Sequence, residues 1–317
     1  MTKKINIFLQ ILFLTILISC NSVKKETTTY FGGKIINPKT NHVILYSMDK
    51  VIDTFLLNTR NKFIGKVNIV NEGLYYFIHG DENQHIYLEP EDSLMLRLNT
   101  WDFDESLVFA GKGAERNNIL VDCFLENEKE RKLFYKFNKS ESNVFKAKVD
   151  SLMLLKLETY NDYVINHPEE TSDFNEILKI TLTYPTFARI EKYPMIYAKY
   201  SENGSFPNMD SSFYDYRNDI QINKGHLMYY PPYSQYIRNY LYNETYALGH
   251  APMKSEYSSK FTLDLMHRID EKITSKKSKN AFLKQTVISH FYNKSSCNIN
   301  YEAFDAFFKL STNDKDL

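Results

Sequence analysis

Short apolar runs fill the first third of the chain, up to about residue 110, and several of them alternate with polar positions. The clearest is the run 93–99, in which Leu94, Leu96 and Leu98 alternate with other side chains, the period-two pattern of a half-buried strand. Polar or glycine- and proline-containing turns separate roughly seven or eight such runs at about ten-residue spacing. The polar turn 58–61 suits a hairpin between its two flanking runs. The pattern predicts a small antiparallel β sandwich or barrel over residues 29–112.

Helical spacing replaces this alternation after Gly113. A stripe at intervals of three and four runs through Phe145, Val149, Leu152, Lys156, Tyr160 and Val164, and Ser172 suits the N-cap of a further helix. Prolines are expected to separate the helices, at positions 168, 185, 194, 207 and 231. The predicted fold class is therefore α+β in two segregated domains, with the β domain followed by an all-α helical domain over 113–317.

The N-terminal segment follows neither pattern. Lys3 and Lys4 precede an almost wholly apolar run of about 14 residues, 5–18, which is shorter than the ~20 residues of a membrane-spanning helix. This length is typical of the apolar region of a secretory signal. A buried core helix fits less well, because no polar face interrupts the run at helical spacing.

The run ends in the residues LISC, positions 17–20, which resemble the lipobox of bacterial lipoproteins. The resemblance implies that residues 1–19 are removed and that Cys20 carries the lipid. Several acyl chains on one residue give a stable anchor where a single chain does not. Residues 20–28 would then be a polar tether, and the protein would lie in the cell envelope, on the periplasmic side or at the cell surface.

Composition narrows the classes of function. The 39 basic and 39 acidic residues balance, which argues against a nucleic-acid partner. The chain contains no Gly-x-Ser-x-Gly, phosphate loop or dinucleotide motif, and its eight histidines lack metal-ligand spacing. We therefore expect no catalytic residues, no metal and no cofactor. The acidic stretch 81–92 is interpreted as solvated turns around a strand, and Trp101 is expected to pack against the sandwich.

Two thiols are left if Cys20 carries a lipid. Cys123 falls at helical spacing with Ile119 and Leu120, which predicts a buried, small apolar side chain. Cys297 lies in a polar stretch that indicates a loop. The sequence leaves open whether the two cysteines pair, because it does not give the distance between them.

A group of tyrosines flanks two prolines near residue 231. Tyr229, Tyr230 and Tyr233 form a candidate docking surface or ligand groove, since a tyrosine offers both apolar area and a hydroxyl. Tyr236 and Tyr240 share a helical face with apolar residues, which predicts that they pack in the core.

The junction between the two predicted domains reads FAGKGAERNN, an apolar strand followed by Gly-x-Gly-Ala and by two asparagines that open a helix. With the lipobox and the order of the domains, this junction resembles the N-terminal portion of TlpA-type thiol-disulfide oxidoreductase lipoproteins of Bacteroidetes-like bacteria. In that family a DUF4369-type β domain and a helical region precede a thioredoxin-fold domain with a Cys-x-x-Cys motif. The segment 230–243 also resembles the family's helical linker. The chain departs from the family because it contains no Cys-x-x-Cys, so no redox residue is carried over.

The resemblance implies a non-catalytic anchoring and docking module of a TlpA-like architecture. The thioredoxin domain would then either be missing because the reading frame is cut short or be supplied by a neighbouring chain. The expected partners are a membrane, through the lipid, and a protein with a thioredoxin fold. One alternative is a stand-alone lipoprotein that binds a ligand or partner in an aromatic cleft between the domains, near Tyr230 and Tyr233. The other is a redox enzyme that uses Cys123 and Cys297.

Overall fold

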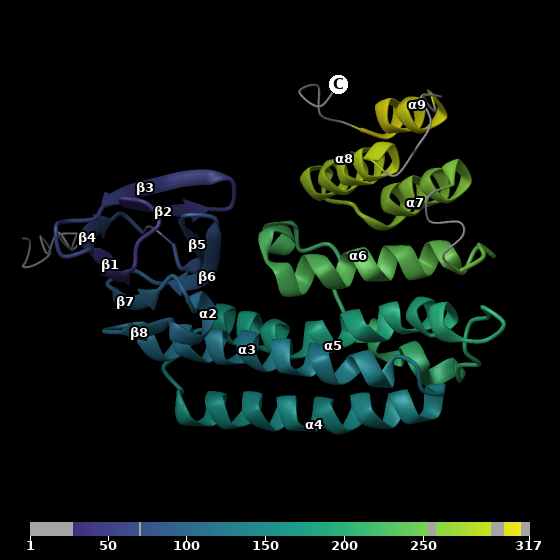
Figure 1. Cartoon of the computed structure of the whole chain (residues 1–317), viewed down its shortest axis with the longest axis horizontal. Coiled ribbons are helices and arrows are strands. Elements are labelled where there is room, and N and C mark those ends of the chain that lie inside the picture. The colour runs from purple at the N-terminus through teal and green to yellow at the C-terminus, as the bar shows by residue number, and fades with distance from the viewer. Residues whose placement is uncertain (1–27, 70, 253–257, 293–300, 312–317) are drawn as a thin grey trace, which may run out of the picture.

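The computed structural model describes residues 28–69, 71–252, 258–292 and 301–311 (Figure 1). A two-sheet β domain is followed by a helical domain, so the predicted fold class is confirmed. Cys20, Cys297 and the residues of the tether before Thr28 lie outside the described residues. Among the helices described, none combines the length and the hydropathy needed to cross a bilayer.

The β domain consists of two four-stranded sheets packed face to face. The first has the order β4-β1-β7-β8 and the second the order β3-β2-β5-β6. The strand bounds are β1 (Thr29–Ile36), β2 (His42–Ser47), β3 (Lys50–Leu56), β4 (Lys62–Val67), β5 (Gly73–His79), β6 (Glu82–Leu88), β7 (Ser93–Asn99) and β8 (Val108–Ala110), and a short helix, α2 (Phe103–Ser106), precedes β8. Leu94, Leu96 and Leu98 are buried, as their alternation predicts. The first sheet is mixed and not purely antiparallel, because β1 and β7 run parallel.

The turn 58–61 does not close a hairpin. β3 and β4 belong to different sheets, so this turn carries the chain across the edge of the sandwich. The reason lies in the core, where Phe55 of β3 and Phe63 of β4 face each other with ring centroids 5.7 Å apart. Trp101 also departs from expectation, because it lies in the turn after β7 with 78% of its surface exposed and does not pack against the sandwich.

The helical domain forms successive layers, from α4 at the bottom of Figure 1 through α5 and α6 to α8 and α9 at the top. Its elements are α3 (Ala114–Phe137), α4 (Ser142–Asn166), α5 (Ser172–Tyr200), the 3₁₀ segments η1 (Ser211–Asp219) and η2 (Gly225–Tyr229), α6 (Pro231–Tyr246), α7 (Ser259–Lys272), α8 (Lys276–Tyr292) and α9 (Tyr301–Leu310). Helix α5 contacts α3, α4 and α6 and is therefore the centre of the domain.

Two prolines that were expected to separate helices lie inside α5. Pro185 and Pro194 are internal to this helix, and its N-cap is Thr171, whose hydroxyl accepts a hydrogen bond from the Phe174 N–H, not Ser172. A proline inside a helix costs about 3 kcal/mol in isolation. Helix α5 continues because its apolar side chains are buried on several sides by the neighbouring helices, so packing outweighs the local cost.

Candidate functional site

The candidate site is the crevice where strand β6 faces the helical domain. The Nε2 atom of His85 lies 3.0 Å from the carbonyl oxygen of Tyr229, so His85 donates this hydrogen bond from its Nε2–H tautomer. The His85 ring also meets the Tyr230 ring edge-on, with centroids 5.5 Å apart. Two residues further along β6, the Tyr87 ring meets the Phe174 ring in the same way at 5.2 Å. The outward side chains of β6 thus join the two domains.

Two asparagines at the start of α3 hold the edges of both sheets. The side-chain oxygen of Asn117 accepts from the Tyr87 N–H at 2.8 Å, and its Nδ2 donates to the Tyr87 carbonyl at 2.8 Å. Asn118 makes the same pair of hydrogen bonds to the backbone of Phe109 in β8, at 2.8 and 3.1 Å. Because β6 and β8 are edge strands, each side chain takes the place of a missing neighbouring strand. We call this pair of side chains the asparagine clasp.

The two glycines before α3 make the turn into this helix. Gly111 and Gly113 have φ values of 90° and 91°, which favour glycine. A Cβ atom on Gly111 would lie 2.0 Å from the Ser93 carbonyl oxygen, and one on Gly113 would lie 2.8 Å from the Asp92 carboxylate. The two glycines of Gly-x-Gly therefore allow the close packing at the domain junction and do not form a phosphate-binding loop.

A buried arginine next to the clasp contacts three carboxylates. Arg116 lies 2.7 Å from Asp92, 2.8 Å from Glu89 and 3.0 Å from Glu170. The expectation of solvated turns is therefore wrong for Glu89 and Asp92, because the β6–β7 turn lies beneath α3. One guanidinium faces three carboxylates, which leaves excess negative charge at the junction. Burial raises the pKa of Glu89, and Asp92 and Glu170 add to the increase while Arg116 opposes it.

The larger pocket of the crevice, which we call the interdomain pocket, has a volume of about 560 Å³, within the range of small-molecule sites. Its polar lining includes Glu72, Tyr75 and Tyr87 of the β domain and Asp173, Glu176 and His226 of the helical domain. The Oε2 atom of Glu72 and the hydroxyl of Tyr87 are buried near each other, but neither makes a hydrogen bond of ordinary length to a described residue. Burial raises the pKa of Tyr87, so its hydroxyl stays protonated at neutral pH. Such buried polar atoms are normally satisfied in a folded protein.

A smaller pocket of about 280 Å³ lies at the other end of β6 and includes Cys123, His85 and Tyr230. Cys123 is buried, as its helical spacing predicts. Burial raises the pKa of its thiol to about 12 and lowers the pKa of His85 to about 4. At neutral pH the pocket is therefore lined by a thiol and a neutral imidazole, and not by the thiolate that nucleophilic or redox chemistry requires.

The predicted tyrosine surface is wrong for two of its three members. Tyr233 is fully buried and donates from its hydroxyl to the Gln221 carbonyl at 2.6 Å. Tyr230 is also buried, where its hydroxyl lies 2.6 Å from that of Thr181. Both hydroxyls find partners inside the helical domain, which is why these rings can be buried. Tyr229 is the one of the three that is exposed.

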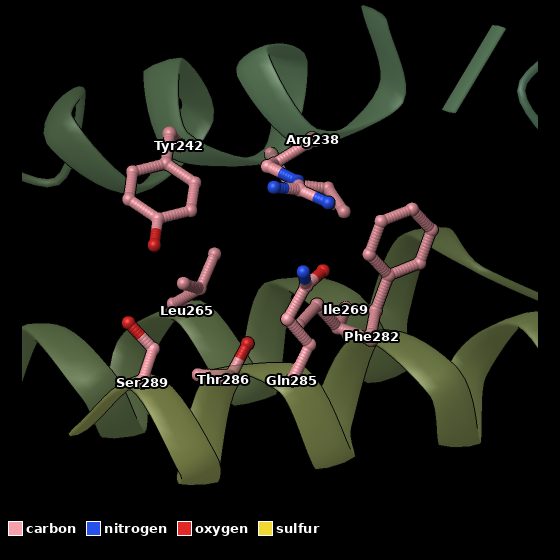
Figure 2. Close-up of a pocket in the computed structure, with 9 residues that line it drawn as sticks. Arg238, Tyr242, Leu265, Ile269, Phe282, Gln285, Thr286 and Ser289 are labelled. Atoms are coloured by element: carbon pink, nitrogen blue, oxygen red, sulfur yellow. The ribbon is translucent and has the colours of Figure 1, made fainter. Parts of the chain in front are cut away.

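Two further pockets lie within the helical domain. Figure 2 shows the first, in which Arg238 and Tyr242 of α6 face Gln285 and Thr286 of α8. Its volume of about 110 Å³ is too small for most metabolites. The second, of about 380 Å³ between α4, α5 and η1, has no buried side-chain polar atom without a partner in its lining. The interdomain pocket is therefore the stronger candidate.

The sequence interpretation missed the residues that build the site. Nothing in the sequence marks Arg116, Asn117 or Glu72 as functional, although Arg116 and Asn117 lie within the AERNN stretch of the junction. Within the described residues, no group of three or more His, Cys, Asp or Glu side chains is arranged to hold a metal ion. Comparisons with known proteins found no match: no family model, no curated protein and no solved structure is similar to the chain.

Proposed function

We propose that this chain is an exported, lipid-anchored docking and binding module of the bacterial cell envelope, built like the N-terminal portion of TlpA-type lipoproteins. The LISC motif at 17–20 and the order of the two domains support this proposal. The observation that carries it is the interdomain pocket, which the asparagine clasp and Arg116 hold between two firmly joined domains. The buried Cys123 thiol supports a role in binding and not in redox chemistry.

Lipid attachment is tested with the full chain expressed in a bacterium that is fed an alkyne fatty acid. The chain should take up the label and sediment with membranes. Cys20→Ser should lose both properties, whereas Cys123→Ser is the matched control and should keep both. Labelling of Cys20→Ser, or no labelling of the unchanged chain, would contradict the lipid anchor.

Docking is tested at Tyr229, the exposed member of the tyrosine group. A photo-crosslinking amino acid at position 229 should capture a thioredoxin-fold protein of the cell envelope, identified by mass spectrometry. The same amino acid at position 292, also exposed but on α8, is the control and should not capture it. A captured protein of another fold at position 229 would refute the partner class.

A second candidate function is the binding of a small organic cation in the interdomain pocket. Glu72 places a buried carboxylate oxygen there, beside the Tyr87 hydroxyl, Asp173 adds a second negative charge, and Glu176 is already paired with Lys224. Tyr75 adds aromatic surface, and such surface attracts an ammonium or guanidinium group. A ligand amine would satisfy the Glu72 oxygen and offset the negative charge at the junction.

Thermal unfolding in the presence of an aliphatic diamine, and of the matching dicarboxylate, tests this second function. The diamine should raise the unfolding temperature and the dicarboxylate should not. Glu72→Gln should remove the effect, while Glu126→Gln, an exposed change on α3, should leave it unaltered. Equal shifts with both compounds would count against a cation site.

A further inference from the structure

The outer face of the first sheet is basic, on the side of the sandwich away from the second sheet. Its outward positions carry Lys62 and Lys66 on β4, Lys34 on β1 and Arg97 on β7, and all four are exposed. No outward position of the four strands carries an acidic residue. None of the four cations forms an ion pair with a described residue. We call this surface the basic face.

The register of the strands places three of these cations in one row. Lys34 lies directly opposite Lys62 on one side and directly opposite Arg97 on the other. Like charges in directly opposite positions destabilise a sheet. The inner face of the sheet, with Phe31 and Leu96, needs no charge on the outer face in order to pack. The row therefore costs stability unless an anion lies against it.

Apolar side chains lie beside this row on the same face. Ile64 is 67% exposed and Val108 is 52% exposed, and Tyr30 is exposed between Lys66 and β7. Met95 is the outward neighbour of Gly32 in the next row. Cations combined with exposed apolar and aromatic side chains are typical of surfaces that lie in the headgroup region of a membrane.

We propose that the basic face binds the surface of an anionic phospholipid bilayer, with the cationic row against lipid phosphates and Ile64 and Tyr30 against the acyl boundary. The proposal rests on the proposed lipid anchor for its location. β1 begins at Thr29, nine residues after Cys20, and nine extended residues span at most about 30 Å. An anchored chain therefore keeps the basic face within reach of the bilayer that holds the lipid.

This orientation leaves the interdomain pocket open. The pocket lies on the side of β5 and β6 in the second sheet, whereas the basic face is the outer side of the first sheet (Figure 1). The two surfaces are on opposite sides of the sandwich, so membrane contact and binding in the pocket are compatible. The lipid would act as a tether and the basic face would set the direction in which the pocket points.

The test uses the unlipidated chain that begins at residue 20 and carries Cys20→Ser, which retains every described residue. Its sedimentation with vesicles of about 30 mol % phosphatidylglycerol in phosphatidylcholine is compared with that on phosphatidylcholine alone. The test variant replaces Lys34, Lys62, Lys66 and Arg97 by Gln. The matched control replaces Lys132, Lys136, Lys192 and Lys276 by Gln, which removes the same charge from exposed helical positions.

Each cation near an anionic surface strengthens binding roughly fivefold, so the test variant should bind the anionic vesicles several-hundred-fold more weakly. The control should change binding less than about tenfold, and salt at about 500 mM should release the unchanged chain. Because the test variant loses the like-charge row, it should unfold at the same or a higher temperature, which separates lost binding from lost folding.

Three results would overturn the proposal: equal binding to both vesicle types, an equal loss in test and control variants, or preferential binding to a soluble polyanion over the anionic vesicles. These outcomes are independent of the lipid anchor, because Cys20 is absent from the assay. Fatty-acid labelling of Cys20 with no charge-dependent vesicle binding would leave the anchor in place and remove the basic face. The reverse result would remove the anchor and keep the face.

Discussion

Removal of one clasp side chain, Asn117→Ala, should destabilise the protein far more than a typical asparagine substitution in a helix. The change leaves the Tyr87 N–H and carbonyl of β6 without partners, since both bond to Asn117 at 2.8 Å and β6 has no further neighbouring strand. A buried backbone group that loses its partner costs about 1–3 kcal/mol, and at about 1.5 kcal/mol each the two groups give a loss of about 3 kcal/mol. Typical domains are stable by 5–15 kcal/mol, so this is a large fraction.

The adjacent change Asn118→Ala is the internal control. Asn118 makes an equivalent pair of hydrogen bonds to Phe109, but it is half-exposed, so water can replace the lost side chain. The expected loss is about 1 kcal/mol. Alanine is the better helix former in both variants, so that gain cancels in the comparison.

Urea unfolding followed by circular dichroism measures both variants, and hydrogen exchange of the β6 peptide reports the freed Tyr87 amide directly. Asn117→Ala should lower the urea midpoint with an unchanged slope and speed exchange in β6. A loss below about 1 kcal/mol, or one no larger than that of Asn118→Ala, would show that the Tyr87 backbone groups reach other partners. The clasp would then not be what joins the domains.

Three further outcomes follow from the same junction. Burial lowers the pKa of His85 to about 4 in the folded state, against about 6.5 in the unfolded state. As the pH falls from 6.5 towards 4 the unfolded state takes up the proton first, so the free energy of unfolding should fall, by about 2 kcal/mol at pH 5. His85→Gln should lose less stability between pH 7 and 5, and equal falls in the urea midpoints of the two proteins would refute this. The Cys123 thiol has its pKa raised to about 12 by burial. In a variant without the other cysteines it should react with Ellman's reagent at pH 8 only after the protein unfolds, and a rapid reaction of the folded protein would disprove its burial. Gly113→Ala should lower the free energy of unfolding by at least about 2 kcal/mol, because its Cβ would meet the Asp92 carboxylate. Gly204→Ala is the control: this residue also has a positive φ but has open space around it, so the expected loss is about 1 kcal/mol. Equal shifts of the melting temperature in the two variants would exclude the contact with Asp92.

Much of the fold follows from local periodicity. The alternation of Leu94, Leu96 and Leu98 predicts which face of β7 is buried, and the intervals from Phe145 to Val164 predict α4. Both signals are properties of neighbouring residues, and burial of one face is the physical event that produces them. Pro185 misleads for the same reason, since its local cost is visible in the sequence while the helices that pack around α5 are not.

The candidate site was much less predictable. Arg116 lies 24 positions from Asp92 and 54 from Glu170, so no spacing rule relates these side chains. The sequence favours a surface position for Tyr230 and Tyr233 because they flank two prolines, yet partners at Thr181 and Gln221 allow their hydroxyls to be buried. A hydroxyl is compatible with the core wherever a partner is present, and that partner comes from elsewhere in the chain.

The sequence by itself determined the order of a β domain and a helical domain, the inward faces of strands and helices, and the burial of Cys123. The tertiary structure alone decided which sheet each strand joins. For this reason the turn 58–61 connects two sheets, and the cations of β1, β4 and β7 lie together on one face. It also placed Asn117 and Asn118 on two strand edges. The physical reason is range: periodicity is set by residues two to four positions apart, whereas strand pairing, ion pairs and pockets depend on which distant segments the whole core brings together.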